Sequence, residues 1–300
     1  MFDRDLLVLD GHTDVPTRLW EEPADLTTRA GDRHVDLPRL RKGGVDGLVF
    51  ALFVPVALSP AAGLEHVKTL HRLAAERLAP GRLEQAESAE QIRRNARRGA
   101  VSVLFGLENG RPLTLPGALE QVARLGVRYV TLTHVSTHEW CDASTDEPQH
   151  DGLAPEGIEI IRELNRRAIL ADVSHVSDSA VEQVLAVATA PVIASHSSAR
   201  ALCDHPRNLP DNLVRDIARQ GGVVMANSYP AFLAPQAARA NERRAAELGP
   251  DLAELGGPYL RDPRKHWREV AELMASHPLP PVDLGVYVDH ILHLIEVAGE

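Results

Sequence analysis

The chain has 300 residues, 44% of them hydrophobic, and a formal net charge of −10 at pH 7. This length and apolar content are enough for a large core, and α/β barrels often reach this size as one domain, so we expect a single domain over residues 1–300. The acidic balance disfavours a nucleic-acid or anionic-lipid partner, and no apolar run approaches the roughly 20 residues of a membrane span.

The first apolar run, residues 6–10, lies close to the N-terminus and is broken by Asp10. It is too short for the core of a signal peptide. The two cysteines, Cys141 and Cys203, lie far apart without CxxC spacing, which indicates neither a disulfide framework nor a thiolate zinc site. We therefore expect a soluble protein in a reducing cytoplasm.

Seven short apolar runs without strict alternation of polar and apolar residues follow one another along the chain. They cover residues 6–10, 47–54, 100–107, 127–133, 168–174, 191–195 and 222–228. Strands that are buried on both faces have this pattern. The segments between them have helical spacing, and several end at glycine, as helices often do.

Strands and helices that alternate in this way predict parallel βαβ units. Seven strands are too many for most open sheets and one short of a closed barrel, so we expect an α/β fold of the TIM-type (β/α)8 barrel kind. From about residue 230 to residue 282 the pattern changes to an Ala/Arg/Glu-rich helix and a Pro-rich connection. We interpret this segment as an insertion after the seventh strand.

Side chains that bind metal ions stand where the predicted strands end. In chain order they are His12, Asp14, Glu108, His134, His175 and His196. A single histidine at a strand end is more often structural than a ligand, but the carboxyl ends of barrel strands meet at one rim, where six such residues indicate a metal centre. Other histidines, such as His66 and His71, fall in helical segments and are expected at the surface.

The residue types favour a two-metal hydrolytic site. His12 and Asp14 alternate in an extended segment and therefore face the same side, so one ion can bind both. Glu108 is costly to bury unless it is paired or metal-bound, and a carboxylate can bridge two ions about 3.5–4 Å apart. His175 and His196 would then hold the second ion. Imidazole and carboxylate without thiolate suit zinc, although Mn, Co or Fe fit the same ligands.

The motifs resemble those of the membrane dipeptidase (renal dipeptidase) family, peptidase family M19. The matching stretches are DGHTD (10–14), GLENG (106–110), LTH (132–134), DVSHVS (172–177), PVIASHSSAR (191–200), HPRNLPD (205–211) and GGVVMANSYP (221–230). They occur in order over most of the chain, and DVSHVS followed by SHSSAR and RNLPD is the specific combination. The resemblance implies zinc-dependent hydrolysis of dipeptides, including those with a D-residue at the C-terminus.

The resemblance also assigns roles. It implies one zinc ion on His12 and Asp14, a second on His175 and His196, and Glu108 as the bridge. Because members of the family are often homodimers, it gives the ground for expecting a homodimer here.

Three further positions concern the substrate. By the same resemblance His134 would be a catalytic residue, beside Glu108, that contacts the substrate and steadies the tetrahedral intermediate. Arg207 would bind the terminal carboxylate of the dipeptide, and Tyr229 would line the same pocket. A planar guanidinium suits two-pronged recognition of a carboxylate.

The sequence departs from the family pattern after residues 290–300. The pattern continues into an eighth strand that ends in a G-S-D-F-D-G-like motif, whose first aspartate is the catalytic acid/base, whereas this sequence stops at Glu300. Three interpretations stay open: a fragment, a second piece that supplies the strand, or a molecule that lacks both barrel closure and the proton-transfer group. The ENG after the third predicted strand (residues 108–110), in place of EGG, is expected to leave Glu108 in place.

Two other functions remain as alternatives. One barrel rim supports many chemistries, so another amidohydrolase, acting on lactones, N-acyl amino acids or cyclic amides, fits the same ligands. A catalytically inactive metal-binding or interaction protein is the alternative from a different class, and the absence of an eighth strand from the sequence favours it.

Overall fold

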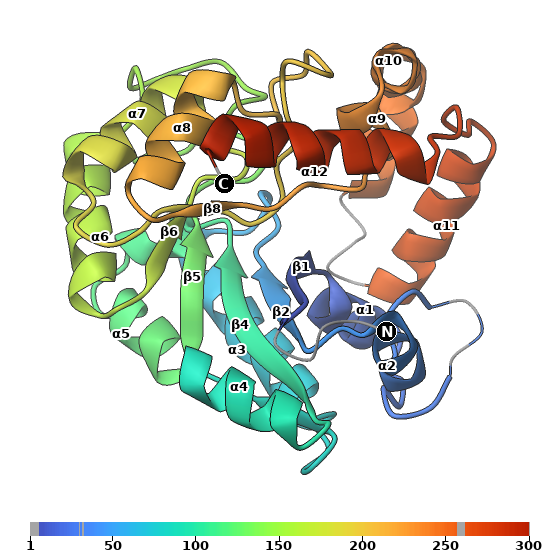
Figure 1. Cartoon of the computed structure of the whole chain (residues 1–300). Coiled ribbons are helices and arrows are strands. Elements are labelled where there is room, and N and C mark those ends of the chain that lie inside the picture. Colours follow the sequence, from blue (N-terminus) through green and yellow to red (C-terminus); the bar gives the residue numbers. More distant parts are fainter. Residues whose placement is uncertain (1–5, 30, 32, 257–261, 300) are drawn as a thin grey trace. The chain divides into compact units, whose positions relative to one another are not determined.

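The structure is a computed structural model that describes residues 6–29, 31, 33–256 and 262–299 (Figure 1). Two compact units make up the chain, Met1–Ile193 and Ala194–Glu300. The expectation of one domain over residues 1–300 stays a prediction. No helix in the described part of the chain combines the length and the apolar character that crossing a membrane requires.

A parallel sheet forms the centre of the first unit. Its strands are paired in the order β1, β2, β4, β5, β6, and the last of them pairs with Ile193 at the start of β7 (Ile193–Ala194). Their bounds are β1 Leu9–Thr13, β2 Gly47–Phe53, β4 Val101–Glu108, β5 Val127–Thr131 and β6 Leu170–Asp172. These strands lie within or beside the predicted runs, which confirms the alternating α/β pattern.

One short strand of the first unit was not predicted. β3 (Leu83–Gln85) pairs in parallel with β4, off the main path of the sheet. Of its three residues only Leu83 is buried. A three-residue strand with two polar side chains contains no apolar run, so its sequence does not predict a strand. Only its pairing with β4 identifies it as one.

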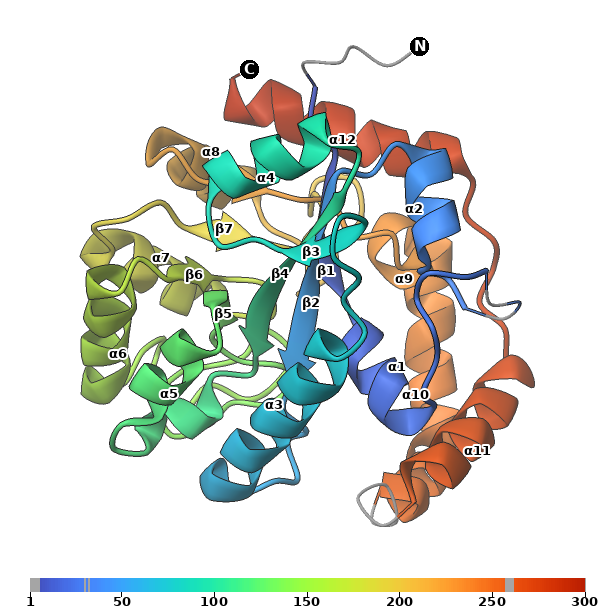
Figure 2. The ribbon, with the colours of Figure 1, turned by 90° about the horizontal axis from the view of Figure 1, so that it is seen from below.

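Helices surround the strands of the first unit. Packing places α3 against β2, α4 against β4, α5 against β5 and α6 against β6, and Figure 2 shows these helices around the outside of the strands. The bounds are α1 Val15–Glu21, α2 Leu37–Gly43, α3 Pro60–Ala75, α4 Ala89–Arg97, η1 Arg111–Thr114, α5 Ala118–Arg124, α6 Pro155–Arg166 and α7 Asp178–Val187. This is the strand-and-helix arrangement of a TIM-type barrel.

Local chemistry explains where several of these helices begin. The Ser59 side chain accepts a hydrogen bond from the Ala62 amide at the start of α3, and Pro60 occupies the first helical position. Ser177 caps α7 in the same way, through the Ala180 amide. Such caps satisfy amides that the helix itself cannot pair, and they fix the point at which each loop from the strands becomes helix.

The second unit continues the pattern and adds further helices. β8 (Val223–Val224) lies beside the Ala194 end of β7, since the Met225 amide donates to the Ala194 carbonyl at 2.8 Å. The helices are α8 Asp211–Arg219, α9 Pro230–Leu233, α10 Pro235–Gly256, α11 Pro263–Ala275 and α12 Leu284–Ala298. Of these, α9, α10 and α11 occupy the segment that the sequence analysis interpreted as an insertion.

Two histidines expected at the surface instead pack on aromatic side chains of the first unit. His66 is buried with its ring edge-on to Trp20 at 4.8 Å between ring centres, and His71 lies 4.5 Å from the Phe105 ring. Both belong to α3, whose inward face also carries Val67 and Leu70. The surface expectation was wrong, because these histidines lie beside the inward face of the helix. Membership of a helical segment does not by itself show which face a residue is on.

Acid is expected to destabilise the first unit through its buried histidines. Burial lowers the pKa of His66 and of His138 to about 4, from an ordinary 6.5. Between these pH values the proton binds only in the unfolded chain, so this stability is complete above pH 6.5 and is lost as the pH falls toward 4. Each histidine should cost roughly 2 kcal/mol of unfolding free energy at pH 5.

Urea unfolding at pH 7.5 and pH 5 measures this loss, with chelator present so that metal release does not contribute. The His66→Leu variant should lose less stability on acidification than the unchanged chain. Replacing the exposed His34 by leucine is the matched control and should leave the pH dependence unchanged. Equal pH dependence in all three proteins would contradict the assignment.

Candidate metal centre

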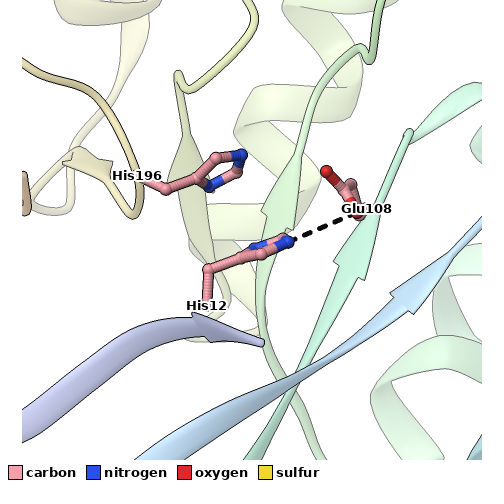
Figure 3. A group of neighbouring side chains, drawn as sticks. All are labelled: His12, Glu108 and His196. Carbon is pink, nitrogen blue, oxygen red and sulfur yellow. Dashed lines mark ion pairs between the residues drawn. The ribbon is translucent and has the colours of Figure 1, made fainter. Parts of the chain in front are cut away.

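Glu108 is the last residue of β4 and is 3% exposed. Nε2 atoms of three histidines of the first unit face its carboxylate, His12 at 3.4 Å, His175 at 3.5 Å and His134 at 3.8 Å. Figure 3 shows the His12 ring directed at Glu108. The fold therefore brings together four residues that are far apart in the sequence and that were predicted to follow or end strands.

The spacing of these atoms fits a metal ion. The distances of 3.4 and 3.5 Å exceed the usual range of a hydrogen bond, about 2.7–3.2 Å. Two ligands that each lie about 2.0–2.1 Å from a tetrahedral ion are separated by about 3.3 Å. Glu108, His134 and His175 form one group whose ligand atoms lie within 4.8 Å of one another. The donors are imidazole and carboxylate, which suit zinc and related ions.

Two hydrogen bonds with Val54 hold the backbone around Glu108. Its carbonyl accepts the Val54 amide at 3.0 Å, and the side-chain amide of Asn109 donates to the Val54 carbonyl at 2.8 Å. Asn109 has a φ of 70°, a left-handed conformation that ends the strand immediately after the carboxylate. Such a conformation costs free energy in a residue other than glycine and persists where surrounding contacts enforce it.

His175 has the same kind of conformation, with a φ of 70°. Its carbonyl accepts two hydrogen bonds, from the Ser144 amide at 2.8 Å and from the Thr133 hydroxyl at 3.1 Å. Its ring lies 4.3 Å from that of His134. These contacts fix the direction in which the His175 side chain leaves the backbone, toward Glu108.

His12 and Asp14 lie on the same side of β1 and its end, as the His-x-Asp spacing predicted. The Asp14 carboxylate is 4.0 Å from Nε2 of His12, and its side chain is 66% exposed. Asp14 occupies the N-cap position of α1 but makes no capping hydrogen bond with its side chain. Its carboxylate is therefore not committed to the helix and can bind an ion beside His12.

The electrostatics of His12 depend on this carboxylate cluster. Burial disfavours its charged form, but the adjacent Glu108 and Asp14 carboxylates outweigh burial and raise the pKa of His12 to about 9. In the absence of metal, both ring nitrogens of His12 thus carry a proton at neutral pH, and the side chain is a cation. A metal ion can take the place of one of these protons, because the ion and the proton neutralise the same carboxylates.

Three further residues predicted from the sequence lie in the second unit. His196 follows β7, and its Nδ1 is 2.7 Å from the Ser195 hydroxyl. Arg207 is 4% exposed, donates to the His196 carbonyl at 3.2 Å, and lies 5.4 Å from the centre of the Phe232 ring. His196 and Arg207 are therefore neighbours within this unit.

Tyr229 meets the same aromatic side chain. Its ring centre is 5.0 Å from that of Phe232, and its hydroxyl donates to Asn241 at 3.0 Å and accepts from Arg244 at 2.6 Å. The structure thus places Tyr229 near Arg207 through Phe232 and ties its hydroxyl to α10. Phe232 was not predicted, because nothing in its local pattern distinguishes it from a core residue.

Comparison with known proteins decides the family. Residues 2–300 match the model of the membrane dipeptidase family, peptidase family M19. The chain belongs to this family. It is 32% identical over 272 residues to an uncharacterised dipeptidase of Schizosaccharomyces pombe, covering 84% of this chain and 66% of the relative. It is 35% identical over 242 residues to dipeptidase verJ of Clonostachys rogersoniana, covering 74% of this chain and 62% of the relative.

Solved structures agree with the fold of this M19 family member. The crystal structure of the probable dipeptidase PvdM from Pseudomonas aeruginosa matches with a TM-score of 0.81 at 25% identity, covering 98% of this chain and 81% of that chain. The TIM-type barrel prediction is thereby confirmed. The matched region spans about two thirds or less of the length of the two curated relatives, 66% and 62%.

The M19 family is one of metallopeptidases, and the structure supplies residues that fit a metal. Asp172 and Tyr129 also lie beside the proposed ligands, and neither was predicted from the sequence. Asp172 ends β6, is fully buried, and accepts hydrogen bonds from the Thr131 hydroxyl and the Ser174 amide. Tyr129 contacts His12. A tyrosine inside a predicted buried strand was the available signal, since a buried hydroxyl requires a partner.

Proposed function

We propose that this M19 family member hydrolyses the amide bond of dipeptides with two zinc ions. The observation that carries the proposal is the buried Glu108 carboxylate, which three imidazole nitrogens face at 3.4 to 3.8 Å. An isolated buried carboxylate would be strongly unfavourable, and cations stabilise it. Dipeptides are the proposed substrate because the curated relatives are named dipeptidases.

The proposed ligands are those that the resemblance assigns. His12 and Asp14 would hold one ion, His175 and His196 the other, and Glu108 would bind both. Bound zinc would polarise the peptide carbonyl and lower the pKa of a water molecule to about 7. Manganese, cobalt or iron fit the same donors, and the metal content of the purified protein identifies the ion.

His134 is the proposed residue for the reacting carbonyl. Its side chain is 24% exposed, and its Nε2 lies 3.8 Å from Glu108, outside hydrogen-bond distance. Its ring is held edge-on against Phe53, at 4.7 Å between ring centres. A fixed, partly exposed imidazole can donate a hydrogen bond to the carbonyl oxygen as negative charge develops there.

Arg207 is the proposed residue for the terminal carboxylate. The guanidinium is 4% exposed, and its planar fork suits two-pronged recognition of a carboxylate. Tyr229 would line the same pocket, next to Phe232. A D-residue at the C-terminus is part of the proposal, because recognition of the carboxylate by Arg207 does not require an L-configured side chain.

The acid/base aspartate, the oligomeric state and the location of the protein stay predictions. For the aspartate, the fragment, the second piece that supplies the strand and the molecule without this group all stay open. The homodimer rests on the resemblance alone, and sedimentation of the purified protein measures it. The cytoplasmic location is likewise an expectation from the sequence.

Hydrolysis of L-Ala-L-Ala and L-Ala-D-Ala by the purified chain, together with its metal content, tests the proposed function. We expect bound zinc, release of free alanine from both dipeptides, and loss of both properties in His175→Ala. A panel with a lactone, an N-acyl amino acid and a cyclic amide tests the alternative amidohydrolase. Turnover of a cyclic amide without turnover of dipeptides would contradict the proposal, as would bound metal without turnover of any substrate.

A further inference from the structure

The Tyr129 hydroxyl contacts two residues of β1, although Tyr129 belongs to a strand that is not adjacent to β1 in the sheet. Its oxygen lies 3.0 Å from Nδ1 of His12 and 3.0 Å from the carbonyl oxygen of Gly11. The tyrosine belongs to β5 and is 3% exposed. β2 and β4 stand between β5 and β1 in the sheet, so the ring spans two strands to reach His12.

Counting protons at this hydroxyl fixes the state of His12. The Gly11 carbonyl can only accept a hydrogen bond, so the single hydroxyl proton of Tyr129 is directed to it. The contact with His12 is then a hydrogen bond only if Nδ1 of the imidazole carries a proton and donates it. Nε2 is thereby left as the nitrogen that binds an ion, and it is the atom that faces Glu108 at 3.4 Å.

A glycine in β4 makes room for the tyrosine ring. Gly106 pairs with Tyr129 in the register of β4 and β5. A Cβ added at Gly106 would lie 2.4 Å from two carbons of the Tyr129 ring, closer than non-bonded atoms approach. The residue of β2 in register with Gly106 is Ala51, which is also small. The sheet therefore lacks bulky side chains at the level where the ring crosses it.

From these contacts we infer that Tyr129 is a positioning residue for the metal centre. Its hydroxyl holds His12 in the tautomer and orientation that present Nε2 to the ion. Gly106 is the backbone position that lets it reach. The inference rests on the proposed metal-binding function. Hydrogen-bond partners of metal ligands raise metal affinity about 10- to 100-fold, because they fix the ring before the ion binds.

The Tyr129→Phe variant tests the inference, because it removes the hydroxyl and keeps the ring. Competition with a chromophoric chelator gives the zinc affinity of the full chain, and urea unfolding in excess chelator gives the stability without metal. We expect the zinc affinity to fall about tenfold or more. The matched control is Tyr287→Phe, since the Tyr287 hydroxyl donates to the Ala226 carbonyl at 3.2 Å within the second unit. It should retain the unchanged chain's zinc affinity.

A second variant tests the position of the ring without removing its hydroxyl, and the unfolding in excess chelator shows whether stability without metal is lost as well. Gly106→Ala leaves every polar group in place but pushes the Tyr129 ring away, so its zinc affinity should fall at least as far as that of Tyr129→Phe. Zinc affinity of Tyr129→Phe equal to that of Tyr287→Phe would overturn the inference and leave the proposed function standing. An unchanged chain that binds no zinc would overturn the proposed function together with the inference.

Discussion

Glu108→Ala is expected to abolish stable metal binding and to lower kcat/KM for dipeptides by at least about 10³-fold. The metal contribution to such a reaction amounts to several kcal/mol, and each 1.4 kcal/mol corresponds to about tenfold in rate. Glu108 is the residue that His12, His134 and His175 all face, so its removal leaves the imidazoles without the shared carboxylate. Loss of a single peripheral ligand would leave part of the cluster intact.

Metal content by elemental analysis and dipeptide hydrolysis measure the effect. Glu108→Gln keeps the size of the side chain and removes its charge, so it should behave like the alanine variant if charge is what the ions require. Glu163→Ala is the matched control, because Glu163 forms ion pairs with Arg166 and Arg167 on the surface of α6. A Glu108→Gln protein with full metal content and activity would contradict the assignment.

Arg207→Ala is expected to lower kcat/KM for dipeptides with a free C-terminal carboxylate by roughly 10²–10³-fold, mostly through KM. Removing one member of a buried, hydrogen-bonded charge pair costs about 2–5 kcal/mol. Arg207→Lys keeps the charge but loses the planar fork, so it should fall between the alanine variant and the unchanged protein. Metal content should stay unchanged in both variants.

The discriminating measurement compares L-Ala-D-Ala with its C-terminal amide. The amide lacks the carboxylate, so it should be a poor substrate for the unchanged protein and lose little further in Arg207→Ala. Arg219→Ala removes an exposed arginine that pairs with Asp216 on α8, and it serves as the matched control. Equal losses on the free acid and on the amide would show that Arg207 supports the fold and does not bind the carboxylate.

The strands were predictable wherever burial on both faces produced an apolar run. β2 and β4 lie almost entirely within the predicted residues 47–54 and 100–107, because each is enclosed on both faces. β3 has no such run and was missed. The packing of His66 and His71 against aromatic rings was missed for a related reason. Helical periodicity shows that a face is apolar, but it does not show which residues at the edge of that face the neighbouring strand and helix cover.

The sequence by itself determined the order of elements and the residue types at the strand ends, because strand termini in a parallel barrel share one rim whatever the details of packing. Only the tertiary structure decided how these residues meet. The distances to Glu108, the left-handed backbone at His175, the Phe232 ring beside Arg207, and the reach of Tyr129 over Gly106 depend on strand register and close packing. Such contacts join residues up to 118 positions apart, and no local pattern encodes the ångström-scale fit of a close-packed interior.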